Sequence, residues 1–219
     1  MSVAPDVDAL VLAAGLGARL GLGPKAWLTL GGRTLVERAV ATMRAIPARV
    51  IVGVPATHLE RARALCGPQA VVVAGGATHR ETTLAAFRAG DAPFVLIHDV
   101  AHPFVTPALA RQVIETARDR GAAVAAVRAT STAYHRVGDA PMTRLDAGDV
   151  WTVRRPFVFR RADFARGLEA AAGGEGLSVI LGRAGVRTEL VPTATWNIKI
   201  TTADDWELAR AIDRELRPV

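Results

Sequence analysis

Short apolar segments alternate with segments of helical periodicity along most of this chain, and this alternation constrains its fold more than any other feature. Apolar runs without a polar face are typical of strands buried on both sides of a parallel sheet, with helices covering the two faces. The sequence therefore predicts a doubly wound α/β fold with a mostly parallel sheet in a single domain spanning residues 1–219. Strands are expected at 10–12, 49–54, 70–74, 94–98, 122–127 and 188–191, and helices at 34–46, 58–66, 82–88, 106–120, 162–172 and 201–216.

Residues 128–155 depart from this pattern. Short polar–apolar alternations there flank the turn-forming sequence at 137–141, Val-Gly-Asp-Ala-Pro. Such a pattern predicts a protruding β-hairpin arm outside the main sheet. Two copies of a chain can form a dimer by exchanging arms of this kind, so we expect a homodimer through the arm.

Composition excludes several other classes of protein. The net charge is +6 and the pI about 10.8, but no basic run exceeds two residues and aromatic residues make up only 5%, so no nucleic-acid partner is expected. No apolar run approaches the roughly 20 residues of a membrane span, and the start of the chain lacks the pattern of a signal peptide. Cys66 is the sole cysteine, and no Cys/His cluster has zinc spacing. We expect a cytoplasmic protein without a membrane partner.

The chain strongly prefers arginine to lysine. Of its 27 cationic residues, only Lys25 and Lys199 are lysines. In a chain that meets its need for surface charge with arginine, a remaining lysine indicates a position where a compact, mobile ammonium group is required. Phosphate chemistry is one such requirement, and chance is the alternative explanation.

Lys25 ends a glycine-rich loop that follows the first expected strand. The loop, residues 13–25, reads Ala-Ala-Gly-Leu-Gly-Ala-Arg-Leu-Gly-Leu-Gly-Pro-Lys. Its glycines allow backbone N–H groups to approach phosphate oxygens, and Arg19 and Lys25 add two cations. No Ser or Thr follows the lysine, as a Walker A loop requires, and Leu20 stands where a dinucleotide fingerprint has a third glycine. A loop for a nucleoside triphosphate is favoured over a flexible loop with surface charges.

Two further segments carry groups that suit phosphate chemistry. Asp99, in the segment 98–104 (His-Asp-Val-Ala-His-Pro-Phe), follows an apolar strand, where ligands of open α/β sheets bind. Beside a triphosphate this carboxylate is a natural Mg²⁺ ligand, although a turn aspartate remains an alternative. Lys199 is expected in a short strand before a helix capped by Thr201, with its ammonium reaching an α-phosphate. The alternative is an edge-strand lysine that extends to solvent.

Together these segments resemble the 2-C-methyl-D-erythritol 4-phosphate cytidylyltransferases, a family of nucleotidyltransferases with a Rossmann-like fold. The resemblance covers nearly the whole chain and is most specific at His98–Phe104 and in the Asn-Ile-Lys-Ile-Thr sequence at 197–201. It implies that Arg19, Lys25 and Lys199 are the catalytic cations. It also implies that Asp99 faces the ribose and Mg²⁺. The implied nucleotide pocket comprises Ala13, Ala14, Gly15, Gly17, Gly76, Thr82 and Asp99.

The departures from the family pattern fall on the side of the acceptor. His102 stands where the family has an arginine, and Ala129-Thr130 replaces an Asp-Thr pair. The arginine of the arm is replaced by Ala147, with Arg144 close by in sequence. The family's Thr-Asp-Asp/Glu-Ala segment is altered around 175–178. His79 stands where the family has an arginine after the Gly-Gly pair, and Arg80 follows it. The resemblance implies acceptor contacts by His102, Thr130, Arg144 and Arg155.

The expected reaction is transfer of CMP from CTP to 2-C-methyl-D-erythritol 4-phosphate with release of pyrophosphate. The altered acceptor side leaves open a cytidylyltransferase for another polyol phosphate. A molybdenum-cofactor nucleotidyltransferase is less favoured, because those enzymes share the opening loop but not the Asn-Ile-Lys segment. A third possibility is a nucleotide-binding homologue without catalytic activity.

Overall fold

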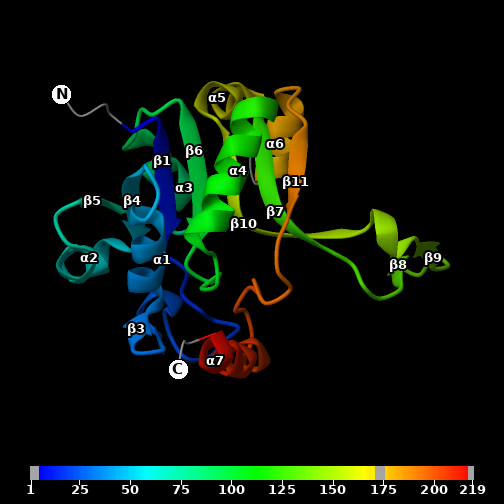
Figure 1. Ribbon diagram of the computed structural model, residues 1–219, viewed down its shortest axis with the longest axis horizontal. Helices are drawn as coiled ribbons and strands as arrows, with labels where there is room; N and C mark the ends of the chain where they lie inside the picture. Colours follow the sequence, from blue (N-terminus) through cyan, green and yellow to red (C-terminus); the bar gives the residue numbers. More distant parts are fainter. Residues whose placement is uncertain (1–4, 171–175, 217–219) are drawn as a thin grey trace.

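The computed structural model describes residues 5–170 and 176–216, and its centre is a seven-stranded sheet of order β11-β7-β10-β6-β1-β4-β5 (Figure 1). Every neighbouring pair is parallel except those made by β10, which runs antiparallel to β6 and β7. The predicted doubly wound, mostly parallel α/β sheet is therefore confirmed. Its strands are β1 (Val7–Leu12), β4 (Arg49–Val54), β5 (Ala70–Ala74), β6 (Phe94–Asp99), β7 (Ala122–Arg128), β10 (Trp151–Arg160) and β11 (Thr188–Pro192).

Helices cover both faces of the sheet because successive residues of a central strand point to opposite sides. Along β1, Val7, Ala9 and Val11 pack in the larger core cluster, with apolar residues of α1, α2, α4 and α7. Leu10 and Leu12 pack in the other cluster, with residues of α3, α5 and α6. The helices are α1 (Leu35–Arg44), α2 (Leu59–Cys66), α3 (His79–Arg88), α4 (Pro107–Arg120), α5 (Arg161–Glu169), α6 (Leu177–Arg183) and α7 (Ala203–Leu216).

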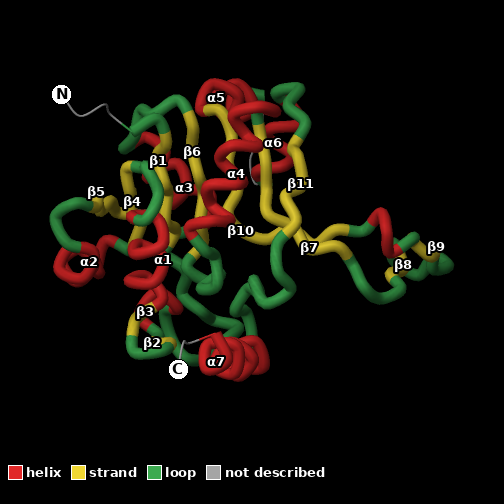
Figure 2. Tube along the Cα trace, viewed as in Figure 1, coloured by secondary structure: helices red, strands yellow, loops and turns green. Residues whose placement is uncertain are grey.

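Two small sheets lie outside the central one. β2 (Thr29–Leu30) pairs with β3 (Arg33–Thr34), and β8 (Ala133–His135) pairs with β9 (Thr143–Leu145). The β8–β9 hairpin stands away from the body at the end of two long connections, as the tube in Figure 2 shows. Short 3₁₀ helices η1 (Lys25–Trp27), η2 (Ala56–His58) and η3 (Ala147–Asp149) complete the elements. None of the helices in the described part of the chain has the length and apolar character needed to span a membrane.

Part of the segment predicted as an arm belongs to the main sheet. Residues Trp151–Val153 of β10 pair with β7, so the expected boundary of the arm at 155 was too late. The sequence did not predict β10 as a strand, because Arg154, Arg155 and Pro156 interrupt its apolar pattern and a proline argues against a central strand. The structure accommodates them where the register between β10 and β7 shifts, between Val153 and Phe157.

Several predicted boundaries near the site also change. α3 begins at His79, one turn before the predicted 82, and α6 was not predicted. Residues 197–200 form no strand, so Lys199 lies in an irregular connection. Thr202 rather than Thr201 caps α7, since its Oγ1 accepts the Asp205 N–H at 3.3 Å. The predicted helix at 162–172 ends at Glu169 as α5, and residues 171–175 lie outside the described residues.

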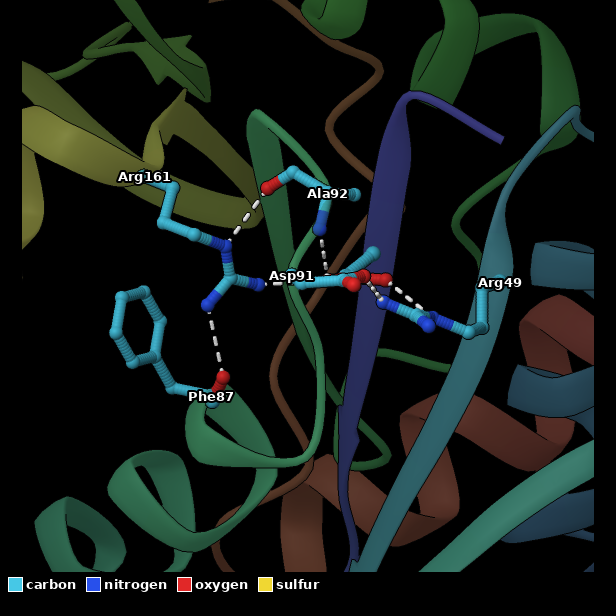
Figure 3. A network of polar contacts seen from close by, with 6 residues as sticks. Arg49, Phe87, Asp91, Ala92 and Arg161 are labelled. Atoms are coloured by element: carbon cyan, nitrogen blue, oxygen red, sulfur yellow. Dashed lines mark hydrogen bonds and ion pairs between the residues drawn. The ribbon is translucent and has the colours of Figure 1, made fainter. Parts of the chain in front are cut away.

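A buried ion network joins several elements at the amino-terminal edge of the sheet. The Asp8 carboxylate on β1 is fully buried. It accepts hydrogen bonds from Arg49 Nε at 2.7 Å, Arg161 NH2 at 2.6 Å and the Ala92 backbone N–H at 2.9 Å. Figure 3 shows Arg49 and Arg161 on opposite sides of this network, with dashed lines for their polar contacts. The network thereby fixes β1, β4 and the start of α5 relative to one another, at the edge of the sheet away from the predicted site.

Candidate active site

The carboxyl ends of β1, β5 and β6 open onto a cavity of about 340 Å³. The loop after β1, the loop between β5 and α3, and the segment after β6 each contribute to its lining. Ligands of open α/β sheets bind outside the carboxyl ends of the strands, so this cavity lies where the fold favours a binding site.

Gly17 determines the shape of the loop after β1, since its backbone conformation and surroundings leave no room for a side chain. Gly17 has φ of 72°, and a Cβ at this position would lie 2.2 Å from the carbonyl oxygen of Gly23. The carbonyl of Gly17 accepts the N–H groups of Leu20 and Gly21 at 2.8 and 3.2 Å. Leu20 is buried and anchors the turn. The predicted glycine loop is thus a folded turn that carries Arg19 at the rim of the cavity.

The segment that carries Lys199 is attached to three distant parts of the chain. Lys25 Nζ donates a hydrogen bond to the carbonyl of Ile200 at 2.7 Å, and the Ile200 N–H donates to the carbonyl of Ala101 at 2.8 Å. Buried Asn197 donates from Nδ2 to the carbonyl of Arg155 at 2.9 Å. These bonds hold Lys199 at the cavity, although no regular strand supports it.

Asp99 faces the two lysines. Its Oδ2 lies 3.9 Å from Lys199 Nζ, and its Oδ1 accepts the Ala101 N–H at 3.0 Å. Burial alone would raise the pKa of Asp99, but the Ala101 hydrogen bond and nearby positive charges hold that pKa below its usual range. Burial lowers the pKa of Lys25, and the charges of Lys199 and Arg19 lower it further against the opposing effect of Asp99. The cavity therefore concentrates positive charge around one carboxylate.

The amino terminus of α3 also faces the cavity. Thr78 caps this helix, because its Oγ1 accepts the Glu81 N–H at 3.1 Å while Glu81 Oε2 accepts the Thr78 N–H at 3.2 Å. Thr82, one turn into the helix, is buried and donates to the Thr78 carbonyl at 3.1 Å. The positive end of the helix dipole and its unpaired N–H groups favour an anion at this point.

The residues predicted for the nucleotide almost all meet at this cavity. Ala13 does not line it, because its side chain is buried and its N–H donates to the Gly53 carbonyl at 2.8 Å. His79 also lines the cavity, whereas the sequence only placed it at the position of a family arginine and predicted no contact for it. The Thr78-x-x-Glu81 capping box is the signal that predicts a helix start there. The predicted residues that line the cavity are Ala14, Gly15, Gly17, Arg19, Lys25, Gly76, Thr82, Asp99 and Lys199.

The residues predicted for the acceptor do not meet at one place. His102 is buried, only 4% exposed, and lines neither this cavity nor the second one. Thr130 and Arg144 are exposed, the latter on β9 of the arm, and also lie outside both cavities. Arg155 lines a second cavity that adjoins the first at Lys199 and His79.

The two histidines flanking Asp99 are uncharged at neutral pH. Burial lowers the pKa of His98 to about 4 and that of His102 to about 3. Neither histidine can therefore provide the cation that the family's arginine would bring to the acceptor side.

Asp99 is the candidate metal ligand. The described residues contain no group of three or more His, Cys, Asp or Glu side chains that could hold a metal ion by themselves. A single carboxylate fits Mg²⁺, which keeps several waters and is commonly bound by one or two carboxylates together with substrate phosphates. The donor set thus suits a magnesium ion that arrives with a triphosphate.

A doubly wound sheet with a glycine loop, two converging lysines and one carboxylate at its carboxyl edge defines an α/β nucleotidyltransferase. The family model of 2-C-methyl-D-erythritol 4-phosphate cytidylyltransferase matches residues 7–215. The chain belongs to this family.

Individual relatives agree with the family. The chain is 36% identical over 217 residues to the 2-C-methyl-D-erythritol 4-phosphate cytidylyltransferase of Thermus thermophilus, covering 95% of this chain and 98% of the relative. It is 34% identical over 213 residues to that of Deinococcus radiodurans, covering 95% and 90%. A crystal structure of the enzyme from Thermus thermophilus superposes with a TM-score of 0.78 at 31% identity, covering 95% of this chain and 98% of the other. A synthase structure from Anaerococcus prevotii, at 22% identity and a TM-score of 0.83, shows the same fold.

Proposed function

We propose that this chain transfers CMP from CTP to 2-C-methyl-D-erythritol 4-phosphate and releases pyrophosphate. The observation that carries the proposal is the meeting of Arg19, Lys25 and Lys199 at one cavity beside Asp99. These groups come from opposite ends of the sequence, and the family and its relatives point to the same reaction.

The chemistry requires positioning and neutralisation of charge more than proton transfer. The acceptor phosphate is already ionised, so its oxygen attacks the α-phosphorus of CTP in line, forming one P–O bond while the bond to the leaving pyrophosphate breaks. Arg19 and Lys25 bind the β- and γ-phosphates, and Lys199 stabilises the charge that develops on the α-phosphate. Gly76 and Thr82, beside the amino terminus of α3, contact the cytidine.

Magnesium belongs to the proposal as a partner of the triphosphate. When bound, it supplies Lewis-acid stabilisation of the phosphate oxygens. Asp99 would hold it, since its carboxylate borders the cavity and has one oxygen free of the Ala101 hydrogen bond. The Asp99→Asn variant should then require a higher Mg²⁺ concentration for half-maximal rate, with little change in the midpoint of thermal unfolding. An unchanged magnesium requirement would contradict this role.

The arm is proposed to form a homodimer, in a cytoplasmic enzyme. It presents a set of exposed apolar side chains that a partner could cover. Sedimentation velocity of the wild type and of a Val137→Asp/Met142→Asp double variant tests the arrangement, with a monomeric wild type as the contradicting result. The exposed apolar side chains of the arm are Tyr134, Val137, Met142 and Leu145.

A coupled assay of pyrophosphate release tests the reaction. We expect release with CTP and 2-C-methyl-D-erythritol 4-phosphate together, and none when either is omitted. Release only with a different polyol phosphate would assign another acceptor. Binding of CTP without release with any acceptor would indicate a homologue without catalytic activity.

A further inference from the structure

The segment that carries Lys199 leads directly into α7, and the Asp205 carboxylate holds the connection between them. Asp205 Oδ2 accepts the backbone N–H groups of Thr201 at 2.9 Å and of Thr202 at 2.8 Å. A capping box accounts for the bond to Thr202, which is the cap residue of α7. The bond to Thr201 is additional, because Thr201 lies before the cap and outside the helix. The carboxylate thus reaches back towards Lys199 further than capping of α7 requires.

The residues between Lys199 and α7 are held along their whole length. The Ile200 N–H donates to the carbonyl of Ala101, and the Ile200 carbonyl accepts the Lys25 ammonium. Thr201 Oγ1 donates to the Lys199 carbonyl at 3.4 Å. Because Lys199 lies in no regular strand, these bonds and those of the carboxylate determine where its backbone lies.

The helix that carries Asp205 is itself attached to the body of the protein. Ala209 is fully buried, and Trp206 packs against the larger core cluster. Near the end of α7, Asp213 Oδ1 accepts a hydrogen bond from Arg38 NH1 of α1 at 2.7 Å. The hydrogen bonds of Asp205 therefore tie the segment of Lys199 to an anchored helix.

The charge of Asp205 also acts on Lys25. Burial and the charges of two neighbouring cations lower the pKa of Lys25, whereas Asp99 and, more weakly, Asp205 oppose that decrease. Burial alone would raise the pKa of Asp205, but the hydrogen bonds from the two threonines and the charge of Lys25 hold that pKa below its usual range. Asp205 is therefore ionised at neutral pH and favours the charged form of Lys25.

We propose that Asp205 is a positioning residue for both lysines of the site, holding the backbone after Lys199 by hydrogen bonds and offsetting the charge of Lys25. The inference rests on the proposed function, since the two lysines are the cations assigned to the phosphates of CTP. Asp205 lines neither cavity, so it acts through the lysines and not by contact with a substrate.

A role limited to capping α7 would have different consequences. Thr202 Oγ1 accepts the Asp205 N–H at 3.3 Å, so Thr202→Ala removes this capping bond and leaves the carboxylate and both of its N–H donors in place. Loss of a cap destabilises a helix without a change at a distant site. Thr202→Ala should therefore lower the midpoint of thermal unfolding and leave kcat unchanged.

Steady-state kinetics with CTP and 2-C-methyl-D-erythritol 4-phosphate measure the effect on the reaction. Asp205→Ala releases both N–H groups, and kcat should fall on the order of tenfold to a hundredfold, as for other small misplacements of a catalytic group. Asp205→Asn keeps an oxygen that accepts the same N–H groups and should recover most of kcat. Asp204 is the matched control, since it is exposed in the same first turn of α7. Asp204→Ala and Asp204→Asn should leave kcat unchanged.

The scarcity of lysine allows a second test that needs no turnover. Lys25 and Lys199 are the only lysines of the sequence, so protein labelled with ¹³C at lysine Cε gives two signals, which Lys25→Arg and Lys199→Arg assign. The titration of each signal with pH reports the pKa of its ammonium group. Asp205→Asn should lower the pKa of Lys25, because it removes a negative charge that favours the charged form, and Asp204→Asn should not. Asp205→Ala should also shift the Lys199 signal at neutral pH, whereas Asp204→Ala should leave it in place.

The outcomes separate this inference from the proposed function. Lysine signals and titrations that are the same in Asp205→Ala as in the wild type would overturn the positioning role, whether or not the protein releases pyrophosphate. An equal fall of kcat in Asp205→Ala and Thr202→Ala would reduce Asp205 to a helix cap and would also overturn it. If Asp205→Ala does not fold, Asp205→Asn decides, and an unchanged Lys25 pKa in this variant contradicts the inference. A wild-type protein that releases no pyrophosphate would contradict the proposed function, while shifted lysine signals would still support the role of Asp205.

Discussion

Lys25 Nζ donates a hydrogen bond of 2.7 Å to the carbonyl oxygen of Ile200, the residue that follows Lys199. The bond joins the end of the glycine loop after β1 to the segment that leads into α7. One lysine thereby positions the other, because moving Lys25 would release the backbone beside Lys199. The two lysines of the chain thus form one structural unit at the cavity, although they are separated by most of the sequence.

Removing either ammonium group should nearly abolish turnover. Lys25→Ala and Lys199→Ala should each lower kcat/KM by about 10²–10³, the usual cost of one transition-state donor. Both variants should unfold within a few degrees of the wild type, since neither lysine belongs to the buried core. Arg33→Ala, which removes an exposed cation from β3, is the control. Near-normal rates in both lysine variants would refute their catalytic roles.

The environment of Lys25 should appear in the pH dependence of CTP capture. Burial, reinforced by Lys199 and Arg19, lowers its pKa from the ordinary 10.5. A lysine with a lowered pKa loses its charge earlier as the pH rises, so kcat/KM for CTP should fall on an alkaline limb below that value. A bound triphosphate favours the charged form, and kcat should therefore persist to higher pH. Lys25→Arg should remove the limb from the pH profile. A limb that is unchanged in this variant would assign it to another group.

Gly17 should be required for the shape of the loop. Gly17→Ala places a Cβ 2.2 Å from the Gly23 carbonyl oxygen at a φ of 72°, so the turn must open. We expect weaker CTP binding by isothermal titration, by about tenfold or more, with an intact fold because Gly17 itself belongs to neither core cluster. Gly182→Ala on α6 is the control, since a Cβ there meets nothing within 4 Å. Equal CTP affinity in wild type and Gly17→Ala would contradict the requirement.

The sequence could predict the edge where the site forms because that edge follows from local patterns. Apolar runs ending at Leu12 and His98 predict parallel strands, and the carboxyl ends of parallel strands meet at one edge. The glycine loop and Asp99 follow those two runs directly, so their proximity needed no knowledge of long-range packing.

The position of β10 could not be predicted in the same way. It enters the sheet antiparallel between β6 and β7, and a strand inserted from later in the chain leaves no local signal of its neighbours. Arg154, Arg155 and Pro156 further conceal it, because a central strand rarely contains such a sequence. Because β10 was not predicted, the cavity that Arg155 of this strand lines could not be predicted either.

On the acceptor side, a residue's position in the family pattern does not by itself predict its place in the site. His102 occupies the family's arginine position but is buried by the surrounding packing, a property that depends on tertiary structure rather than on sequence spacing. Arg155 lies 53 positions later and reaches the neighbouring cavity only because β10 returns to the sheet beside β6.

The buried carboxylate at the opposite edge should contribute to stability without affecting catalysis. Asp8→Asn removes the charge that pairs with Arg49 and Arg161 while keeping the shape of the side chain. Breaking a buried pair on one side costs about 3–5 kcal/mol, so the free energy of unfolding measured in urea should fall by roughly that amount.

Asp91→Asn is the matched control for this prediction. Asp91 also pairs with Arg49, but its side chain is 90% exposed, so its loss should change stability little. At a temperature where Asp8→Asn remains folded, its kcat/KM should match that of the wild type, because the network lies at the edge of the sheet away from the cavity. Equal stability of the Asp8→Asn and Asp91→Asn variants would show that burial does not strengthen this network. A loss of activity in folded Asp8→Asn would instead show that the two edges of the sheet are coupled.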